Sequence, residues 1–244
     1  MARIAEQSPP FLTAEWRNLV MLTFAVDPAA IIDRVPAGTT LDTWRGKAMV
    51  SLVGFQFLNT KVLGAPVLFH QDFEEVNLRF YVRHVTDDDE VRPGVVFVCE
   101  IVPRPVVGSM ARLLYREPYF VAPMKSEITA DPAPNVRYDW QVKGRWYSIA
   151  ARGEGAGTPP APGSLEEYLT ERHWGYNGES GKDTIEYQVD HPRWRIWLAQ
   201  DVRFDADFSA LCGSDLARRF QAPASTLVAE GSAVTIHWRT RIAG

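Results

Sequence analysis

The residues from Phe73 to Val82 carry the side chains of this chain that are best suited to chemistry, and they read FEEVNLRFYV. Because successive side chains of a β-strand point to opposite faces, every second residue of this run lies on one face. That face carries Glu75, Asn77, Arg79 and a tyrosine. A carboxyl group beside an amide and a guanidinium can exchange protons and bind an anion. The opposite face is apolar, so the polar face either lines a pocket or lies in solvent.

A second group of candidate residues lies in the run ARLLYREPYFVAPM. The apolar spacing over residues 106–117 predicts a short helix that ends at Pro118. This helix carries Arg112 and Tyr115, and Tyr119 follows the proline. A guanidinium presents a fork that fits a carboxylate, so we expect Arg112 to clamp an anion and the tyrosines to contact the same ligand. The alternatives are a surface arginine and ordinary packed tyrosines.

Two further arginines are candidates of the same kind. Arg17 lies in the run EWRN, and Arg172 lies in the run SLEEYLTERHW. Either guanidinium could hold the carboxylate of a substrate. For Arg172 and the neighbouring His173, exposure to solvent at the end of a helix is the alternative, and we assign no role to His173.

Several familiar kinds of site are excluded by their motifs. The five histidines do not pair at metal-ligand spacing and no CxxC motif is present, so we predict no metal site. The run GEGAG at residues 153–157 lacks the Lys-Ser/Thr of a phosphate-binding loop and is soon followed by two prolines. No G-x-S-x-G motif exists, which excludes an α/β-hydrolase. We therefore expect no cofactor.

Composition favours one domain in the cytoplasm. The 244 residues are 46% hydrophobic, which suits a single domain over residues 1–244. The net charge is −4 with both signs interspersed, which argues against a nucleic-acid partner. The N-terminus lacks the apolar run of a signal peptide, and no stretch approaches the ~20 apolar residues that span a bilayer. Only two cysteines are present, which suits a reducing compartment, so we expect a cytoplasmic protein without a membrane partner.

Strand patterns dominate the elements that must position these residues. Short helices are predicted over residues 28–34, 106–117 and 165–174, the last from a capping box of Ser164 and Glu167. Residues 151–163 (ARGEGAGTPPAPG) are predicted to be a flexible Gly/Pro loop within the domain. Because no βαβ alternation is sustained, the fold class is α+β, mostly β and mainly antiparallel. Strands are predicted over residues 16–26, 47–57, 75–84, 95–102, 136–140, 145–150, 184–189, 194–204 and 233–242.

Three runs resemble the YqjF-like family of uncharacterised proteins (DUF2071), which is similar in fold to acetoacetate decarboxylase. They are FEEVNLRFYV, ARLLYREPYFVAP and SLEEYLTER, and the resemblance extends from about Pro9 to Arg241. The resemblance implies a cone-shaped antiparallel β-barrel with a few short helices packed around it. In that fold a strand at this place supplies a carboxylate to a pocket, and Glu75 is the matching position. Small closed barrels commonly hold one small ligand.

The same resemblance implies that the lysine pair of acetoacetate decarboxylase is missing from this chain. In acetoacetate decarboxylase the corresponding helix ends in a Gly-Phe-Pro-Lys-Lys type of segment, in which one lysine forms a Schiff base and the other lowers its pKa. The matching residues here are REPYF, so Tyr119 and Phe120 stand where the two lysines would be. Neither side chain can form an imine. Lys47 and Lys61 are predicted at the surface, and the motif does not place Lys125 in the pocket.

Three functions remain open. The first is an enzyme that acts on a small organic acid or carbonyl compound by acid/base chemistry, with Glu75 and Tyr119 as catalytic residues, through enolisation, hydration or decarboxylation without a covalent step. The second is a small-molecule binding protein without chemistry. The third is a structural or interaction protein with a vestigial pocket. Some of the eight tryptophans could lie at a subunit contact, so a homo-oligomer also stays open. The residues predicted to bind the substrate are Arg17, Asn77, Arg79, Arg112, Tyr115 and Arg172.

Overall fold

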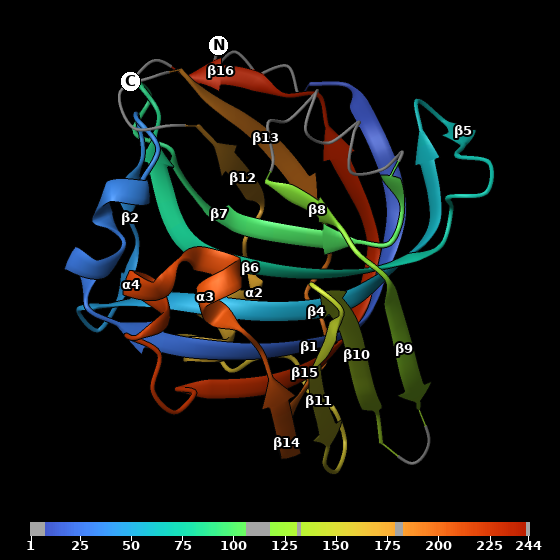
Figure 1. Ribbon diagram of the computed structural model, residues 1–244. Coiled ribbons are helices and arrows are strands. Elements are labelled where there is room, and N and C mark those ends of the chain that lie inside the picture. Colours follow the sequence, from blue (N-terminus) through green and yellow to red (C-terminus); the bar gives the residue numbers. More distant parts are fainter. Residues whose placement is uncertain (1–7, 106–117, 131–132, 179–182, 243–244) are drawn as a thin grey trace.

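The computed structural model describes residues 8–105, 118–130, 133–178 and 183–242, and most of them lie in strands (Figure 1). The helices are short: η1 (Pro28–Ala30), η2 (Ile32–Arg34), α2 (Leu165–Thr170), α3 (Phe208–Cys212) and α4 (Ser214–Ala217). The strands are β1 (Pro10–Val26), β2 (Thr40–Leu41), β3 (Thr43–Trp44), β4 (Lys47–Val62), β5 (Ala65–Pro66), β6 (Phe73–Val85), β7 (Val91–Val102), β8 (Tyr119–Val121), β9 (Met124–Thr129), β10 (Asn135–Val142), β11 (Arg145–Gly153), β12 (Trp174–Asn177), β13 (Thr184–Asp190), β14 (Ile196–Asp205), β15 (Ser225–His237) and β16 (Thr240–Ile242).

Seven strands close into a ring, in the order β13-β12-β7-β6-β4-β1-β15. The ring closes where β15 pairs with β13, through Val189 with Ile236 and Asp190 with Thr235. Closure matters because a closed sheet has no exposed edge at which its strands could separate or pair wrongly. Six of the seven contacts are antiparallel, and only β12 runs parallel to its neighbour β7. The predicted class, α+β and mostly β, is confirmed, with two parallel pairs, β12 with β7 and β8 with β7, that the patterns did not indicate.

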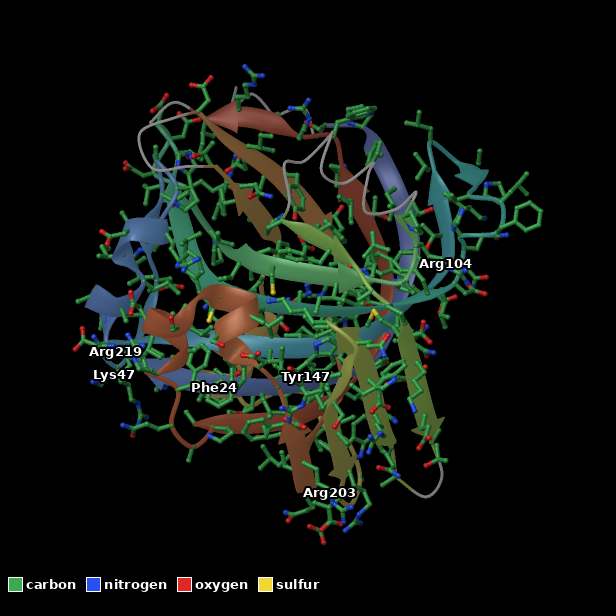
Figure 2. All side chains as sticks on the ribbon, in the orientation of Figure 1. Phe24, Lys47, Arg104, Tyr147, Arg203 and Arg219 are labelled. Atoms are coloured by element: carbon green, nitrogen blue, oxygen red, sulfur yellow. The ribbon has the colours of Figure 1, made fainter. Side chains whose placement is uncertain are left out.

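A second sheet leaves the ring at β14, which pairs with β15 and then continues the order β14-β11-β10-β9. It extends below the ring in Figure 1. The core between the two layers contains Leu78 and Phe80 from β6 and Trp140 and Ile149 from the second sheet. We call this the outer core. Figure 2 labels two of its other members, Phe24 and Tyr147, near the centre of the view.

A separate core fills the inside of the ring. It contains residues such as Met21, Phe55, Tyr81 and Tyr187 from the ring strands, together with Leu169 of α2. We call this the inner core. The two cores share the same strands, so β1, β4 and β6 are buried on both faces, and side-chain alternation sends successive residues to different cores.

The predicted helices differ from the structure in length. Residues 28–34 form two separate 3₁₀ turns, capped at the start by Asp27, which accepts a hydrogen bond from Ala29 N at 2.9 Å. Helix α2 begins at Leu165 as predicted but ends at Thr170. It stops early because Trp174 is taken into the ring as the first residue of β12. The helix predicted over residues 106–117 lies outside the described residues.

The predicted Gly/Pro loop begins later than expected. Its first three residues continue β11 as far as Gly153, and Thr158 then forms a bridge with Ile196, with N–O distances of 3.0 and 2.9 Å. Sequence patterns missed β9, β12 and the first half of β15. Among the residues that the structure describes, none of the helices is long and apolar enough to cross a membrane.

Candidate functional site

A cavity of about 130 Å³ lies inside the ring. Its size is close to that of an engineered cavity of roughly 150 Å³ that admits benzene, so it suits a small organic molecule. Most of its wall is apolar and comes from the inner core, and the polar groups are concentrated where β6 and β7 meet. The charged and hydrogen-bonding residues of that region are Glu75, Asn77, Arg79, Glu100, Tyr119 and Arg172.

Glu75 is the centre of this polar group and is only 2% exposed. The Nδ2 atom of Asn77 donates to its Oε1 at 3.0 Å, and the hydroxyl of Tyr119 donates to its Oε2 at 3.0 Å. Burial disfavours the charged form and raises the pKa of Glu75 to about 7, although both hydrogen bonds and the charge of Arg79 act in the opposite direction. A carboxyl group with such a pKa can accept and release a proton near neutral pH.

Arg79 lies on the same face of β6 and is 8% exposed. Its Nε atom and the Oδ1 atom of Asn77 are buried and have no hydrogen-bond partner within the described part of the chain. The guanidinium carbon lies 5.9 Å from the centre of the Tyr81 ring. Buried polar groups are normally hydrogen-bonded, so a guanidinium with a free N–H in a cavity is well suited to bind an anionic or carbonyl oxygen.

The register of the ring explains why these side chains meet. Residues Glu75 and Asn77 of β6 lie opposite Phe55 and Val53 of β4, all of which face the cavity. On the other side, β7 has a bulge between the residues that pair with Leu78 and Arg79. This extra residue places Glu100 opposite Asn77 and directs its side chain into the cavity as well.

Arg172 lines the cavity but is held by other groups. It forms an ion pair with Asp42 at 2.6 Å, and its Nε atom donates to the carbonyl oxygen of Tyr168 at 2.5 Å. Its guanidinium carbon lies 3.9 Å from the centre of the Tyr168 ring and 5.1 Å from that of Tyr81. Arg172 is therefore committed to Asp42 and Tyr168, whereas Arg79 has the free N–H.

The remaining predicted residues fall into two groups. Arg17 does not line the cavity; its guanidinium pairs with Glu15 at 2.8 Å and reaches the carbonyl oxygen of Gly231 at 3.3 Å. The physical reason is the alternation of β1, since Trp16 faces the cavity and Arg17 therefore faces away. Arg112 and Tyr115 lie outside the described residues.

The lysines that the structure describes are all exposed. Lys47, Lys61, Lys125 and Lys143 lie at the surface, and Figure 2 shows Lys47 at the outer edge of the molecule. At the two positions that match the lysine pair of acetoacetate decarboxylase, β8 directs the Tyr119 hydroxyl to Glu75 and leaves Phe120 53% exposed. No lysine lines the cavity among the described residues, and these residues also contain no cluster of three metal-ligating side chains.

Comparison with solved structures identifies the class of fold as that of the acetoacetate decarboxylase-like enzymes. The enduracididine biosynthesis enzyme MppR matches with a TM-score of 0.69 and 13% identity, over 97% of this chain and 89% of that one. An acetoacetate decarboxylase-like enzyme from Sphingomonas wittichii RW1 gives 0.65 and 14%, over 97% and 94%. Acetoacetate decarboxylase from Legionella pneumophila gives 0.64 and 12%, over 100% and 92%. At these identities the likeness shows the fold alone.

Within that class the chain belongs to the DUF2071 family, described as an uncharacterized conserved protein, whose model matches residues 13–233. A similar relative is "Uncharacterized protein YqjF" of Bacillus subtilis (strain 168). It is 29% identical over 188 residues, which cover 77% of this chain and 74% of the relative. The resemblance seen in the three sequence runs is thereby confirmed.

Proposed function

We propose that this protein is an enzyme that acts on a small organic acid or carbonyl compound by acid/base chemistry, with Glu75 as the proton-transferring group. The observation that carries the proposal is the buried Glu75 carboxyl, hydrogen-bonded to Asn77 and Tyr119 at the wall of a cavity that also presents Arg79. Buried carboxyl groups with shifted pKa values occur preferentially at functional sites.

Each residue has a distinct part in the proposed reaction. Ionised Glu75 removes a proton from the carbon next to a carbonyl group, and the electron pair of that C–H bond moves to the carbonyl oxygen to form an enolate. Arg79 stabilises the negative oxygen, because a guanidinium in a water-poor cavity interacts strongly with developing charge. Tyr119 and Asn77 hold the carboxyl in place. The proton on Glu75 exchanges with solvent, and transfer of a solvent-derived proton from Glu75 back to the carbon completes the cycle without an added group.

This mechanism differs from chemistry that uses a Schiff base. An imine requires an amine nucleophile, and no lysine lines the cavity among the described residues. One neighbour in fold, MppR, is described in complex with pyruvate, a 2-oxo acid. The carboxylate and the ketone of pyruvate match a cavity that offers the guanidinium of Arg79 beside the carboxylate of Glu75. We therefore choose 2-oxo acids as the first compounds to test.

The test measures exchange of hydrogen for deuterium at the substrate carbon, so it requires no assumption about the final product. Short-chain 2-oxo acids are incubated with the protein in D₂O, and deuterium incorporation at the carbon next to the ketone is followed by ¹H NMR. We expect at least one acid to exchange faster with wild type than in buffer, and Glu75→Gln to remove the acceleration while thermal shifts still detect the ligand. Arg79→Met is expected to weaken both binding and exchange.

Two other outcomes would favour the alternatives. Thermal shifts that depend on Arg79, without exchange or other turnover, would identify a non-catalytic small-molecule binding protein. No shift and no exchange with any acid would indicate a vestigial pocket and a structural or interaction role. The Glu230→Gln variant, in which an exposed carboxylate paired with Arg195 is changed, is the matched control and should behave as wild type.

A further inference from the structure

Three further residues of the cavity wall carry polar atoms that the proposed reaction does not use. These atoms are the hydroxyl of Thr60, the Nδ1 atom of His70 and the indole Nε1 of Trp16, and all three residues line the cavity. Each of these atoms is buried without a hydrogen-bond partner in the described parts of the chain, and Thr60 is only 3% exposed. Buried polar atoms are normally satisfied, so their collection in one cavity indicates a ligand that supplies the missing partner.

Thr60 and His70 form a second polar region at a distance from the first. Along β4, Thr60 lies five residues beyond Phe55, the residue opposite Glu75. At about 3.3 Å per residue this is roughly 16 Å, somewhat less because Asn59 has a positive φ and bends the strand. The amide of Thr60 donates to the carbonyl oxygen of Gln71 at 3.1 Å, which places the segment carrying His70 beside it. We call Thr60 and His70 the distal subsite; Trp16, which pairs with Phe57 on β4, lies between this subsite and Glu75.

Aromatic side chains separate the two polar regions. Phe57 and Phe73 stack with ring centres 4.7 Å apart, and Trp16 packs edge-on against Phe55 and Phe57 at 5.6 and 5.9 Å. All of these side chains line the cavity. This stretch offers no charge, so it suits the hydrocarbon part of a ligand.

We infer that the cavity binds an elongated organic acid that is polar at both ends, with its acid group at Arg79, a hydrocarbon body along the aromatic stretch, and a hydroxyl or carbonyl group at the distal subsite. This inference rests on the proposed function and names the substrate class of the same site. The Thr60 hydroxyl can both donate and accept a hydrogen bond, so the distal group of the ligand must be able to make one hydrogen bond of either kind. A hydroxyl group satisfies this condition and can also donate to His70.

Isothermal titration with paired compounds tests the inference. Butanoate, hexanoate and octanoate are compared with the same acids carrying a terminal hydroxyl. We expect the hydroxy acid to bind roughly fivefold more tightly at one chain length, because a buried hydrogen bond contributes about 1 kcal/mol. Thr60→Val removes the hydroxyl at almost constant volume, and His70→Phe removes the ring nitrogens but keeps a ring. Either change should bring the affinity ratio of the pair close to one, whereas Thr129→Val, on the exposed strand β9, should leave the ratio as in wild type.

The possible failures separate the two proposals. Equal affinity of the hydroxy and plain acids at every length, or a ratio unchanged by Thr60→Val and His70→Phe, would overturn the distal subsite while leaving the role of Glu75 intact. Absence of binding for both series would overturn the elongated ligand, whereas the role of Glu75 is decided separately by the exchange of 2-oxo acids. Melting temperatures of the variants show that they are folded. Thr60→Val should be near neutral in stability, because it removes no hydrogen bond to a described residue.

Discussion

At the scale of single residues, the burial of Glu75 makes this protein sensitive to pH. The pKa of Glu75 is raised from 4.5 to about 7. Below about pH 4.5 the carboxyl is protonated in both the folded and the unfolded chain. Between these values the unfolded chain releases the proton while the folded protein retains it, so the free energy of unfolding falls as the pH rises.

Glu75→Gln should remove this dependence, because the amide keeps the shape of the side chain but does not titrate. Relative to the variant, wild type should lose up to about 3 kcal/mol between pH 4.5 and pH 8. For a chain of this length that corresponds to roughly 6–12 °C in melting temperature. Circular dichroism melts of both proteins at pH 4.5, 6 and 8 measure the difference. Parallel curves for the two proteins would show that Glu75 titrates at its ordinary pKa.

Tyr119→Phe should raise the pKa of Glu75 further, because the lost hydrogen bond stabilises the ionised carboxylate. The expected increase is on the order of one pH unit. A ¹³C NMR titration of the glutamate carboxyl groups measures it, with the Glu75 signal assigned by its loss in Glu75→Gln. Tyr147→Phe, in the outer core, is the matched control and should leave the midpoint unchanged. A lower midpoint in Tyr119→Phe would contradict the assigned hydrogen bond.

Part of this site could be predicted from single residues and part could not. Strict alternation was enough to place Glu75, Asn77 and Arg79 on one face, because a strand has a period of two. The same rule applied to β1 would have excluded Arg17, which follows the inward Trp16. Glu100 was missed, although a single acid within the apolar run VVFVCEIV was a usable signal. The roles of all these residues stay predictions.

At the scale of elements, a strand bulge and the early end of a helix could not be predicted from the sequence. The bulge in β7 directs Glu100 towards the cavity. No glycine, proline or other turn residue in the run VVFVCEIV marks the position of this bulge. Helix α2 was predicted to continue to Trp174 because local propensity favoured it. The pairing of β12 with β7 and β13 overrides that propensity, and such tertiary contacts are not visible in a local pattern.

The start of α2, by contrast, depends on a local cap. The Ser164 hydroxyl accepts a hydrogen bond from the amide of Glu167 at 3.1 Å, and the Glu167 carboxylate accepts one from the amide of Gly163 at 2.6 Å. Ser164→Ala should therefore cost about 1 kcal/mol of stability, measured by urea denaturation. Ser214→Ala, at an exposed position that begins α4, should change stability by less than about 0.5 kcal/mol. Equal effects of the two changes would refute the cap.

At the scale of the whole molecule, the shared strands couple the two cores. Strands β1, β4 and β6 contribute one face to the inner core and the other to the outer core. Neither core can form without them, so we expect one cooperative unfolding transition, with calorimetric and van't Hoff enthalpies that agree. Differential scanning calorimetry measures both. Two separate transitions would contradict the predicted single domain.

The alternation along β6 also bears on how proteins of this fold could diversify. The outer-core residues Leu78 and Phe80 secure the scaffold, whereas Glu75, Asn77 and Arg79 contact only the cavity side of the strand. Substitutions in the second set can change which compound is recognised without disturbing the contact between the two sheets. Related proteins could therefore acquire new substrates through substitutions at the positions of Glu75, Asn77 and Arg79. Selection for folding would act mainly on Leu78 and Phe80, and selection for chemistry on their neighbours in the same strand.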